Sequence, residues 1–137
     1  MVYDPPMPVS WRIAEGCALL ESDEMATLDE WKGAVDAALR ARDFKRGMAV
    51  VHDLRRMFRV PTPDEARARL AFLVSRSREF GVSRWAIVVA GTAHYGMGRM
   101  AEFLSEDERA VEFQVFREPA EAIAWAARDA AAGGNVA

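Results

Sequence analysis

The chain has 137 residues, of which 51% are hydrophobic and 28% charged, and its formal net charge is −3. This length corresponds to one ordinary domain, and the composition excludes a disordered or fibrous protein. A single cysteine excludes an intramolecular disulfide framework and a multi-cysteine metal cluster, and no uninterrupted apolar run exceeds six residues, too few to span a membrane.

The N-terminal segment contains three prolines and one acidic residue but no basic one. We therefore expect a flexible arm over residues 1–9 and no signal peptide. Residues 10–131 are expected to form one domain, and residues 132–137 a frayed tail. Without a targeting segment, the expected location is a bacterial-type cytoplasm.

The first elements are indicated by short-range patterns. Residues 11–19 alternate between apolar and polar or small side chains around a Glu-Gly pair, which predicts a two-stranded hairpin. Thr27 and Glu30 form a capping-box pattern, and apolar residues at helical spacing predict a helix from 28 to about 42. The apolar run at 47–54 ends in polar residues and is typical of a buried parallel strand.

A second helix begins near residue 62. Thr62 is placed to act as its N-cap, with Pro63 at the first helical position and Glu65 two residues further on. The apolar face of this helix continues to Phe80, and Gly81 is a plausible stop. The pattern predicts one continuous helix over about 19 residues.

The last third of the chain again alternates between element types. Residues 85–90 predict a second buried strand, and the glycine-bearing segment 91–98 is expected to be a turn leading into a short helix that ends near residue 104. Alternation over 111–115 predicts a half-exposed strand, and Pro119 opens an alanine-rich helix. This order argues for an α/β domain with a mostly parallel sheet covered by helices.

Several segments carry a resemblance to a known family: residues 50–54, 84–89 and 95–100, and 115–117 followed by 122–125. Together with the order of elements, they resemble the SpoIIAA-like, or STAS-like, family over roughly residues 10–128. The branch they resemble is bacterial and has similarity to CRAL-TRIO lipid-transfer domains. The resemblance implies a mixed, mostly parallel sheet with an N-terminal hairpin and about four flanking helices.

Founding members of this family are switched by phosphorylation of a serine in an Asp-Ser-Ser-Gly segment at the start of the second helix. That segment is absent here, and residues 60–64 offer only the hydroxyl of Thr62. A phosphate at a helix N-cap is physically favourable. The N-cap role is sufficient to account for a threonine at position 62. Thr62 is therefore a disfavoured candidate for a phosphorylation switch.

Two predicted loops follow the carboxyl ends of parallel strands, the usual place for ligands in such sheets. The candidate ligand-binding residues in these loops are His52, Asp53, Arg55, Thr92, His94, Tyr95 and Arg99. His52, Asp53 and His94 could act as a catalytic base, an orienting group and an acid. However, no nucleophilic residue stands at a spacing that is diagnostic of a known mechanism. Their spacing also fits no recognised metal-ligand pattern, so we expect neither catalysis nor a metal.

The glycine-bearing segment has a partial likeness to a phosphate-binding loop. Residues 91–96 match the first six positions of a Walker A motif, but Met97 and Gly98 stand where lysine and serine or threonine are required. Free amides beside Arg99 could still bind an anion weakly. The alternative is that the glycines only permit a tight turn and close packing. No cofactor is expected.

The charges are unevenly distributed. Residues 1–39 carry a balance of −6, residues 40–84 of +7 and residues 85–137 of −4. A genome that favours arginine explains this, and the alternative is a binding face in the middle third. Nucleic acid is not the expected partner, because the whole chain is acidic and no nucleic-acid-binding motif accompanies the arginines.

The second helix carries the candidate partner face. On a helical wheel, Phe72 lies outside the apolar stripe, next to Arg69 and Arg76. This arrangement indicates a protein or dimer contact, or contact with an anionic amphiphile. The alternative is a single exposed phenylalanine, which is normal on any protein surface.

We therefore expect a non-catalytic binding or regulatory module that acts through protein–protein contacts or as a homo-oligomer. The alternative is a carrier or sensor of a small apolar or amphipathic, lipid-like ligand. A third hypothesis is an enzyme that uses His52, Asp53 and His94. The candidates to line a deformable apolar pocket for such a ligand are the phenylalanines and Met25, Met48, Met57, Met97 and Met100.

Overall fold

The structure is a computed structural model that describes residues 8–24, 26–81, 83–109 and 111–133. Within these residues one sheet is formed by β1 (Val9–Ala14), β2 (Cys17–Ser22), β3 (Ala49–Asp53), β4 (Ser83–Val88) and β5 (Val111–Phe116). The strands lie side by side in chain order. The first two are antiparallel, as a hairpin must be, and every other neighbouring pair is parallel.

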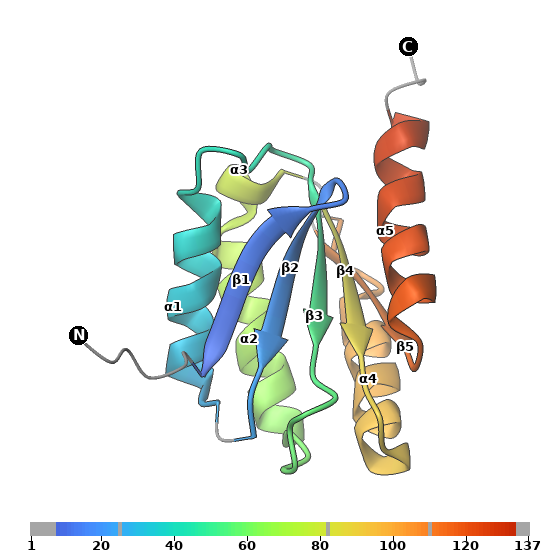
Figure 1. The fold of residues 1–137 in the computed structure, drawn as a ribbon. Helices are drawn as coiled ribbons and strands as arrows, with labels where there is room; N and C mark the ends of the chain where they lie inside the picture. Colours follow the sequence, from blue (N-terminus) through green and yellow to red (C-terminus); the bar gives the residue numbers. More distant parts are fainter. Residues whose placement is uncertain (1–7, 25, 82, 110, 134–137) are drawn as a thin grey trace, which may run out of the picture.

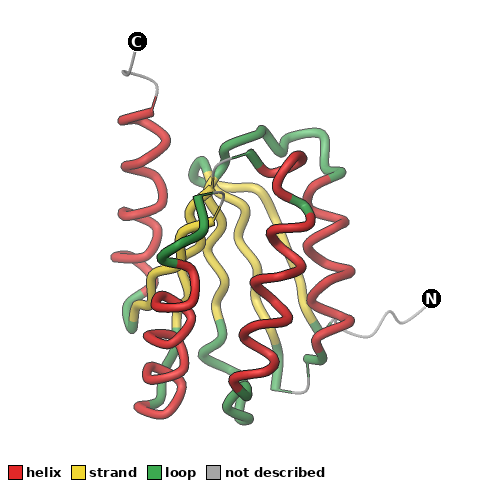
Figure 2. The backbone as a smooth tube through the Cα atoms, turned by 180° about the vertical axis from the view of Figure 1, so that it is seen from behind, coloured by secondary structure: helices red, strands yellow, loops and turns green. Residues whose placement is uncertain are grey.

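Helices cover both faces of the sheet unequally (Figures 1 and 2). They are α1 (Leu28–Leu39), α2 (Pro63–Ser75), the four-residue α3 (Ser77–Phe80), α4 (Thr92–Ser105) and α5 (Pro119–Gly133). The helices that connect parallel strands lie on the same face of the sheet. This follows because such crossover connections are right-handed, and each one here leads from a strand to the next strand in the same direction across the sheet. Helix α5 follows the last strand and packs on the other face.

The two faces of the sheet bury different side chains, because alternate residues of a strand point to opposite faces. The face under α1, α2 and α4 buries large residues, including Trp31, Leu73, Phe80, Trp85 and Phe113. The face under α5 buries mostly small ones, including Cys17, Ala49, Ala86, Ala122 and Ala126. Cys17 thus packs as a small hydrophobic residue, and burial raises the pKa of its thiol.

Both predicted helix starts are confirmed. Thr27 and Thr62 each accept a hydrogen bond from the backbone N–H of the glutamate three residues later, and that glutamate's carboxylate accepts from the N–H of the threonine. These are complete capping boxes. Pro63 occupies the first turn of α2, as expected.

The predicted single helix over residues 62–80 is wrong in one respect, because it is broken after Ser75. The Ser75 hydroxyl donates to the Phe72 carbonyl at 2.5 Å, a local bond that competes with the helical ladder. Arg76 leaves the helical conformation, and α3 then runs to Gly81, whose φ of +72° ends it. That left-handed conformation favours glycine.

The predicted turn over residues 91–98 is also wrong. Helix α4 begins at Thr92, directly after Gly91, and includes both remaining glycines. A Cβ at Gly98 would lie 2.4 Å from Val115 Cγ2, so this glycine allows α4 to lie close to β5. Packing against the sheet therefore outweighs the low helix propensity of glycine.

The ends of the domain differ slightly from the expected boundaries. Val9, placed in the expected arm, is the first residue of β1 and is 1% exposed. Helix α5 continues to Gly133, beyond residue 131. Residues 1–7 and 134–137, the rest of the expected arm and tail, lie outside the described residues. No helix in the described part of the chain is long and apolar enough to cross a membrane.

Candidate functional site: a cavity on the aromatic face of the sheet

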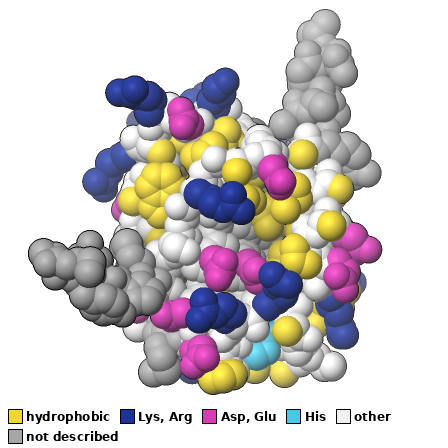
Figure 3. Space-filling model, in the orientation of Figure 1, with side chains coloured by type: hydrophobic (Ala, Val, Ile, Leu, Met, Phe, Trp, Pro, Cys, Tyr) yellow, Lys and Arg dark blue, Asp and Glu magenta, His cyan; other side chains and the backbone are white. Residues whose placement is uncertain are grey.

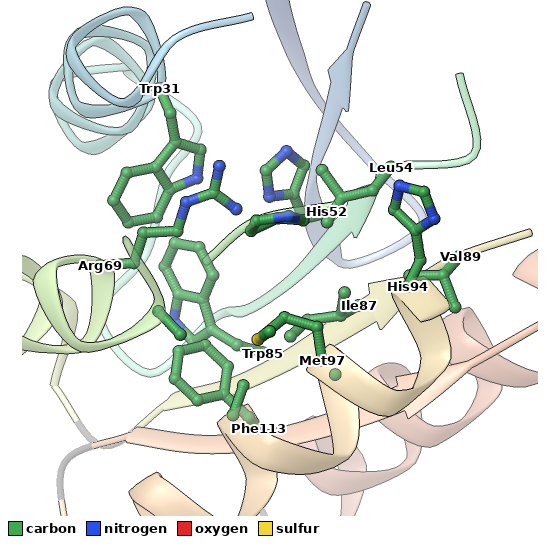
Figure 4. Close-up of a pocket in the computed structure, with 14 residues that line it drawn as sticks. Trp31, His52, Leu54, Arg69, Trp85, Ile87, Val89, His94, Met97 and Phe113 are labelled. Atoms are coloured by element: carbon green, nitrogen blue, oxygen red, sulfur yellow. The ribbon is translucent and has the colours of Figure 1, made fainter. Parts of the chain in front are cut away.

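A partly open cavity of about 60 Å³ lies on the aromatic face, bordered by the sheet, α1, α2 and α4 (Figure 4). Its walls are mostly apolar. The sheet and its strand ends contribute His52, Leu54, Trp85, Ile87, Val89 and Phe113, and the helices and the loop before α2 contribute Trp31, Pro61, Ala66, Arg69, His94, Met97, Gly98 and Ala101.

His52 forms part of the wall from the middle of the sheet. It is 3% exposed, and its Nε2 is 2.6 Å from the hydroxyl oxygen of Ser22 on the neighbouring strand, in a hydrogen bond. Its ring stacks on Trp31 with 6.5 Å between centroids. Burial, and then the positive charge of Arg69, lower the pKa of His52 to about 3. His52 is therefore a neutral polar group at neutral pH.

Arg69 reaches into the same region from α2. Its guanidinium carbon lies over the Trp31 ring, 5.4 Å from the centroid, in a cation–π contact. Figure 4 shows the guanidinium extended toward Trp31 and His52. Its Nε is shielded from water and has no hydrogen-bond partner in the described residues. Burial lowers the pKa of this guanidinium, as expected for a cation in apolar surroundings.

The described residues contain three buried side-chain polar atoms without a hydrogen-bond partner, and all belong to cavity-lining residues. They are Nε1 of Trp31, Nε of Arg69 and Nε1 of Trp85. An unsatisfied buried donor costs about 1–3 kcal/mol, and native proteins keep few of them. All three are N–H donors, so the walls of the cavity contain unused donors and lack acceptors for them.

His94 bounds the cavity at the start of α4. Its Nε2 donates a hydrogen bond to the backbone carbonyl of Arg59 at 3.2 Å. Arg59 in turn pairs with the carboxylate of Glu65 in the first turn of α2. The loop between β3 and α2 is thereby tied to both α2 and α4 beside the cavity.

The structure separates the residues of the predicted ligand site. His52 and His94 line one cavity, although they come from different loops of the sequence. Asp53 and Arg55 lie in another groove, on the α5 side of the sheet and beside β1 and β2. Successive residues of a strand face opposite ways, so Asp53 is directed away from the His52 side. The three residues of the enzyme hypothesis therefore do not share one cleft.

Asp53 is engaged by its neighbour. Both of its carboxylate oxygens bind the Arg55 guanidinium, the shortest contact being 2.8 Å, and the Arg55 N–H donates to Oδ1 at 3.0 Å. Burial alone would raise the pKa of Asp53, but these interactions with Arg55 lower it. Across the lower part of this face, basic and acidic side chains are intermixed (Figure 3).

The remaining loop candidates lie on α4 but do not line the cavity. Thr92 is exposed at the first position of the helix. Tyr95 is half-buried, with the Arg117 guanidinium over its ring at 4.7 Å. Arg99 pairs with Glu102 at 2.9 Å and lines a polar groove elsewhere on the surface.

The premise of the predicted partner face is wrong for Phe72. This residue does not lie outside the packed part of α2: it is half-buried and packs edge-on against Trp31 of α1, with 5.5 Å between ring centroids. Arg76 lies over its ring at 4.4 Å and forms an ion pair with Asp36 of α1 at 2.8 Å. Phe72 and Arg76 thus join α2 to α1, whereas Arg69 contributes to the cavity.

Sequence reasoning missed most of the cavity walls. Trp31, Trp85 and Phe113 sit at core positions of their elements, which identifies them as buried but not as lining a hollow. Of the methionines proposed for a pocket, Met97 lines the cavity, whereas Met57 belongs to the core. Met25 lies outside the described residues. No local pattern marks Arg69 as part of this site, because Glu65 stands four residues before it on the same helix, the usual spacing of an ion pair.

Comparisons with known proteins identify the architecture. No protein-family model matches the chain, and no curated protein matches it. Among solved structures it is similar to an uncharacterised protein of the DUF3478 family from Shewanella loihica PV-4, described as having a SpoIIAA-like fold. The match has a TM-score of 0.57 and 16% sequence identity, and it covers 86% of this chain and 91% of that one. The fold is therefore SpoIIAA-like, as the sequence resemblance implies.

Proposed function

We propose that this protein binds a small, largely apolar molecule in the cavity between α1, α2 and α4, and acts as its carrier or sensor. The observation that carries the proposal is the cavity itself, with its apolar walls and unused donors. Ligand sites in proteins are typically concave and apolar with a few polar groups that orient the ligand. This cavity has that composition.

The geometry favours binding over catalysis. His52 is neutral, fully buried and hydrogen-bonded to a serine, and the adjacent Asp53 lies in a different groove. An orienting carboxylate within hydrogen-bond reach is therefore missing from the His52 side among the described residues. The hypothesis of a regulatory protein–protein contact stays a prediction, but it loses the support of an off-face Phe72.

Binding can be tested through the indole N–H signals of the four tryptophans in a two-dimensional NMR spectrum. Adding a neutral apolar probe such as 1-hexanol should shift the signals of Trp31 and Trp85, which line the cavity. The signals of Trp11 and Trp125, which do not line it, should stay in place. Native mass spectrometry of protein purified from its own host should show a bound small molecule.

Filling the cavity provides the control. Ala101→Leu adds volume at a lining position and should abolish the shifts, whereas Ala124→Leu, at an exposed position of α5, should leave them unchanged. If millimolar probe shifts none of the four indole signals in the unmodified protein, the proposed function is wrong.

A further inference from the structure

We propose that the ligand of this cavity is an apolar monocarboxylate whose carboxylate is bound by the Arg69 guanidinium. This inference rests on the proposed function and specifies the chemical class of the ligand. It follows from the pairing of charges on α2, from the geometry of the guanidinium and from the polarity and size of the cavity.

Two neighbouring arginines, one on α2 and one at its C-cap, are paired with carboxylates of the protein. Arg67 pairs with Asp64 at 2.9 Å, and Arg76 pairs with Asp36 at 2.8 Å. Arg69 is the arginine directed into the cavity, and its Nε, shielded from water, has no hydrogen-bond partner among the described residues. Glu65, four residues earlier on α2, attracts Arg69 electrostatically, but both of its carboxylate oxygens are hydrogen-bonded to Arg59.

Arg69 is half-buried, and its Nε is shielded from water without a partner, which is costly for a charged group unless a ligand pairs with it. The cation–π contact with Trp31 compensates only in part, because it uses the flat face of the guanidinium. The N–H donors of a guanidinium point outward from its edge, in the plane of the group. Stacking therefore leaves them free, and a carboxylate is the acceptor that matches them in both charge and shape.

The neighbouring groups favour the same class of ligand. The unpartnered indole N–H of Trp31 lies beside the guanidinium and can donate but cannot accept. His52 is neutral at neutral pH. Arg69 is the single arginine among the lining residues, which include no lysine, so the permanent charge of the walls matches a monoanion better than a dianionic phosphate.

The rest of the cavity sets the size and polarity of the tail. Leu54, Ile87, Val89 and Met97 provide an apolar wall beyond the polar groups. A water molecule needs about 10–15 Å³ of such volume, so the cavity of about 60 Å³ has the room of about four to six waters. A short aliphatic acid such as a six-carbon one matches this volume, and the tail of a long-chain acid would have to extend out of the cavity.

The test compares two probes of matched length, hexanoate and 1-hexanol, at pH 7, titrated into the protein while the indole N–H signals are recorded. Hexanoate should bind at least about tenfold more tightly than the alcohol, as expected for a hydrogen bond to a charged group. The Nε–H signal of Arg69 should shift with hexanoate.

Two variants of α2 assign the effect to its residue. Arg69→Met removes the charge while keeping an unbranched apolar side chain, and it should bind both probes equally. Arg69→Gln retains N–H donors without a charge and should recover only a small part of the preference. Arg67→Met, which removes an exposed arginine from the same helix, should keep the full preference for hexanoate.

The possible failures are distinct. Equal binding of hexanoate and 1-hexanol to the unmodified protein, or an unchanged preference in Arg69→Met, overturns the carboxylate inference while the proposed binding function stands. Failure of both probes to bind overturns the proposed function and this inference with it. An unperturbed set of the other indole signals verifies that each variant is folded.

Discussion

The two faces of the sheet are packed by different kinds of residues, and the candidate site lies on one of them. Under α5, alanines and a cysteine allow the helix to lie close to the strands. Under α1, α2 and α4, rigid aromatic rings meet mainly edge to face, for example Trp31 with Trp85 at 63°. Flat rings packed at steep angles leave gaps between them, whereas small residues such as alanine pack without gaps. On the aromatic face the remaining gap is the cavity.

The two faces also differ in whether their buried polar groups have hydrogen-bond partners. The unpartnered buried donors of the described residues all lie on the aromatic face. On the α5 side, the buried part of Asp53 is matched by Arg55. One face thus satisfies its own polar groups, whereas the other leaves donors in the wall of a cavity. This contrast distinguishes a structural core from a candidate binding site in this small domain.

The largest loss of stability on the aromatic face is expected for Trp85→Ala. This residue is almost fully buried, packs against both Trp31 and Phe113, and lines the cavity. We expect a loss of about 3–5 kcal/mol in the free energy of unfolding, the usual range for a buried tryptophan. Urea denaturation measures it. A loss below that of Trp11→Ala, a half-exposed residue of β1, would contradict the packing described here.

Replacing an alanine by leucine should affect the free energy of unfolding differently on the two faces. Ala126→Leu, on the tightly packed α5 face, should lower the free energy of unfolding by about 1–3 kcal/mol because no space exists for the larger side chain. Ala101→Leu, at the cavity, should cost less than about 0.5 kcal/mol or stabilise the fold. Equal losses in the two variants would show that the faces are packed alike.

The buried histidine makes the aromatic face sensitive to acid. The pKa of His52 is about 3 in the folded protein against 6.5 when unfolded, so between these values the unfolded state binds the extra proton. Stability is therefore fully present above pH 6.5 and is lost as pH falls toward 3. Between pH 8 and pH 5 the loss should be about 2 kcal/mol.

The groups that face His52 are Ser22, Trp31 and Arg69, and Asp53 is its neighbour in the chain. Urea denaturation at several pH values measures the slope. His52→Gln should remove it, and His94→Gln serves as the control because it leaves His52 in place. A slope that persists in His52→Gln would assign the acid sensitivity to other groups.

A smaller effect than that of the buried histidine is expected for Arg69→Met without ligand. Removing this half-buried cation, whose Nε has no partner, should raise the free energy of unfolding by about 1 kcal/mol, because its desolvation is no longer required. Thermal unfolding of the ligand-free protein measures this. Arg76→Met should have the opposite sign, because it breaks an ion pair between α1 and α2. Destabilisation in both variants would show that Arg69 is already paired in the protein.

Local patterns account for the parts of the fold that were predicted correctly. The capping boxes at Thr27 and Thr62 involve residues three apart, and the strands are marked by their own apolar patterns. The opposite directions of His52 and Asp53 also follow from strand alternation, a signal that the pairing hypothesis overlooked. Gly98 was wrongly assigned to a turn because its close neighbour in the fold, Val115, is distant in sequence.

The sequence by itself determined that the chain has an α/β fold, that its strands are mostly parallel, and that α1 and α2 begin at capping boxes. These properties depend on hydrophobic periodicity and on bonds between near neighbours. Only the tertiary structure decided that Phe72 packs against α1, that His52 and His94 line one cavity, and that the Nε of Arg69 lacks a partner there. The net charge of −3 concealed that last fact, because whether an arginine is paired depends on which carboxylates the fold brings to it.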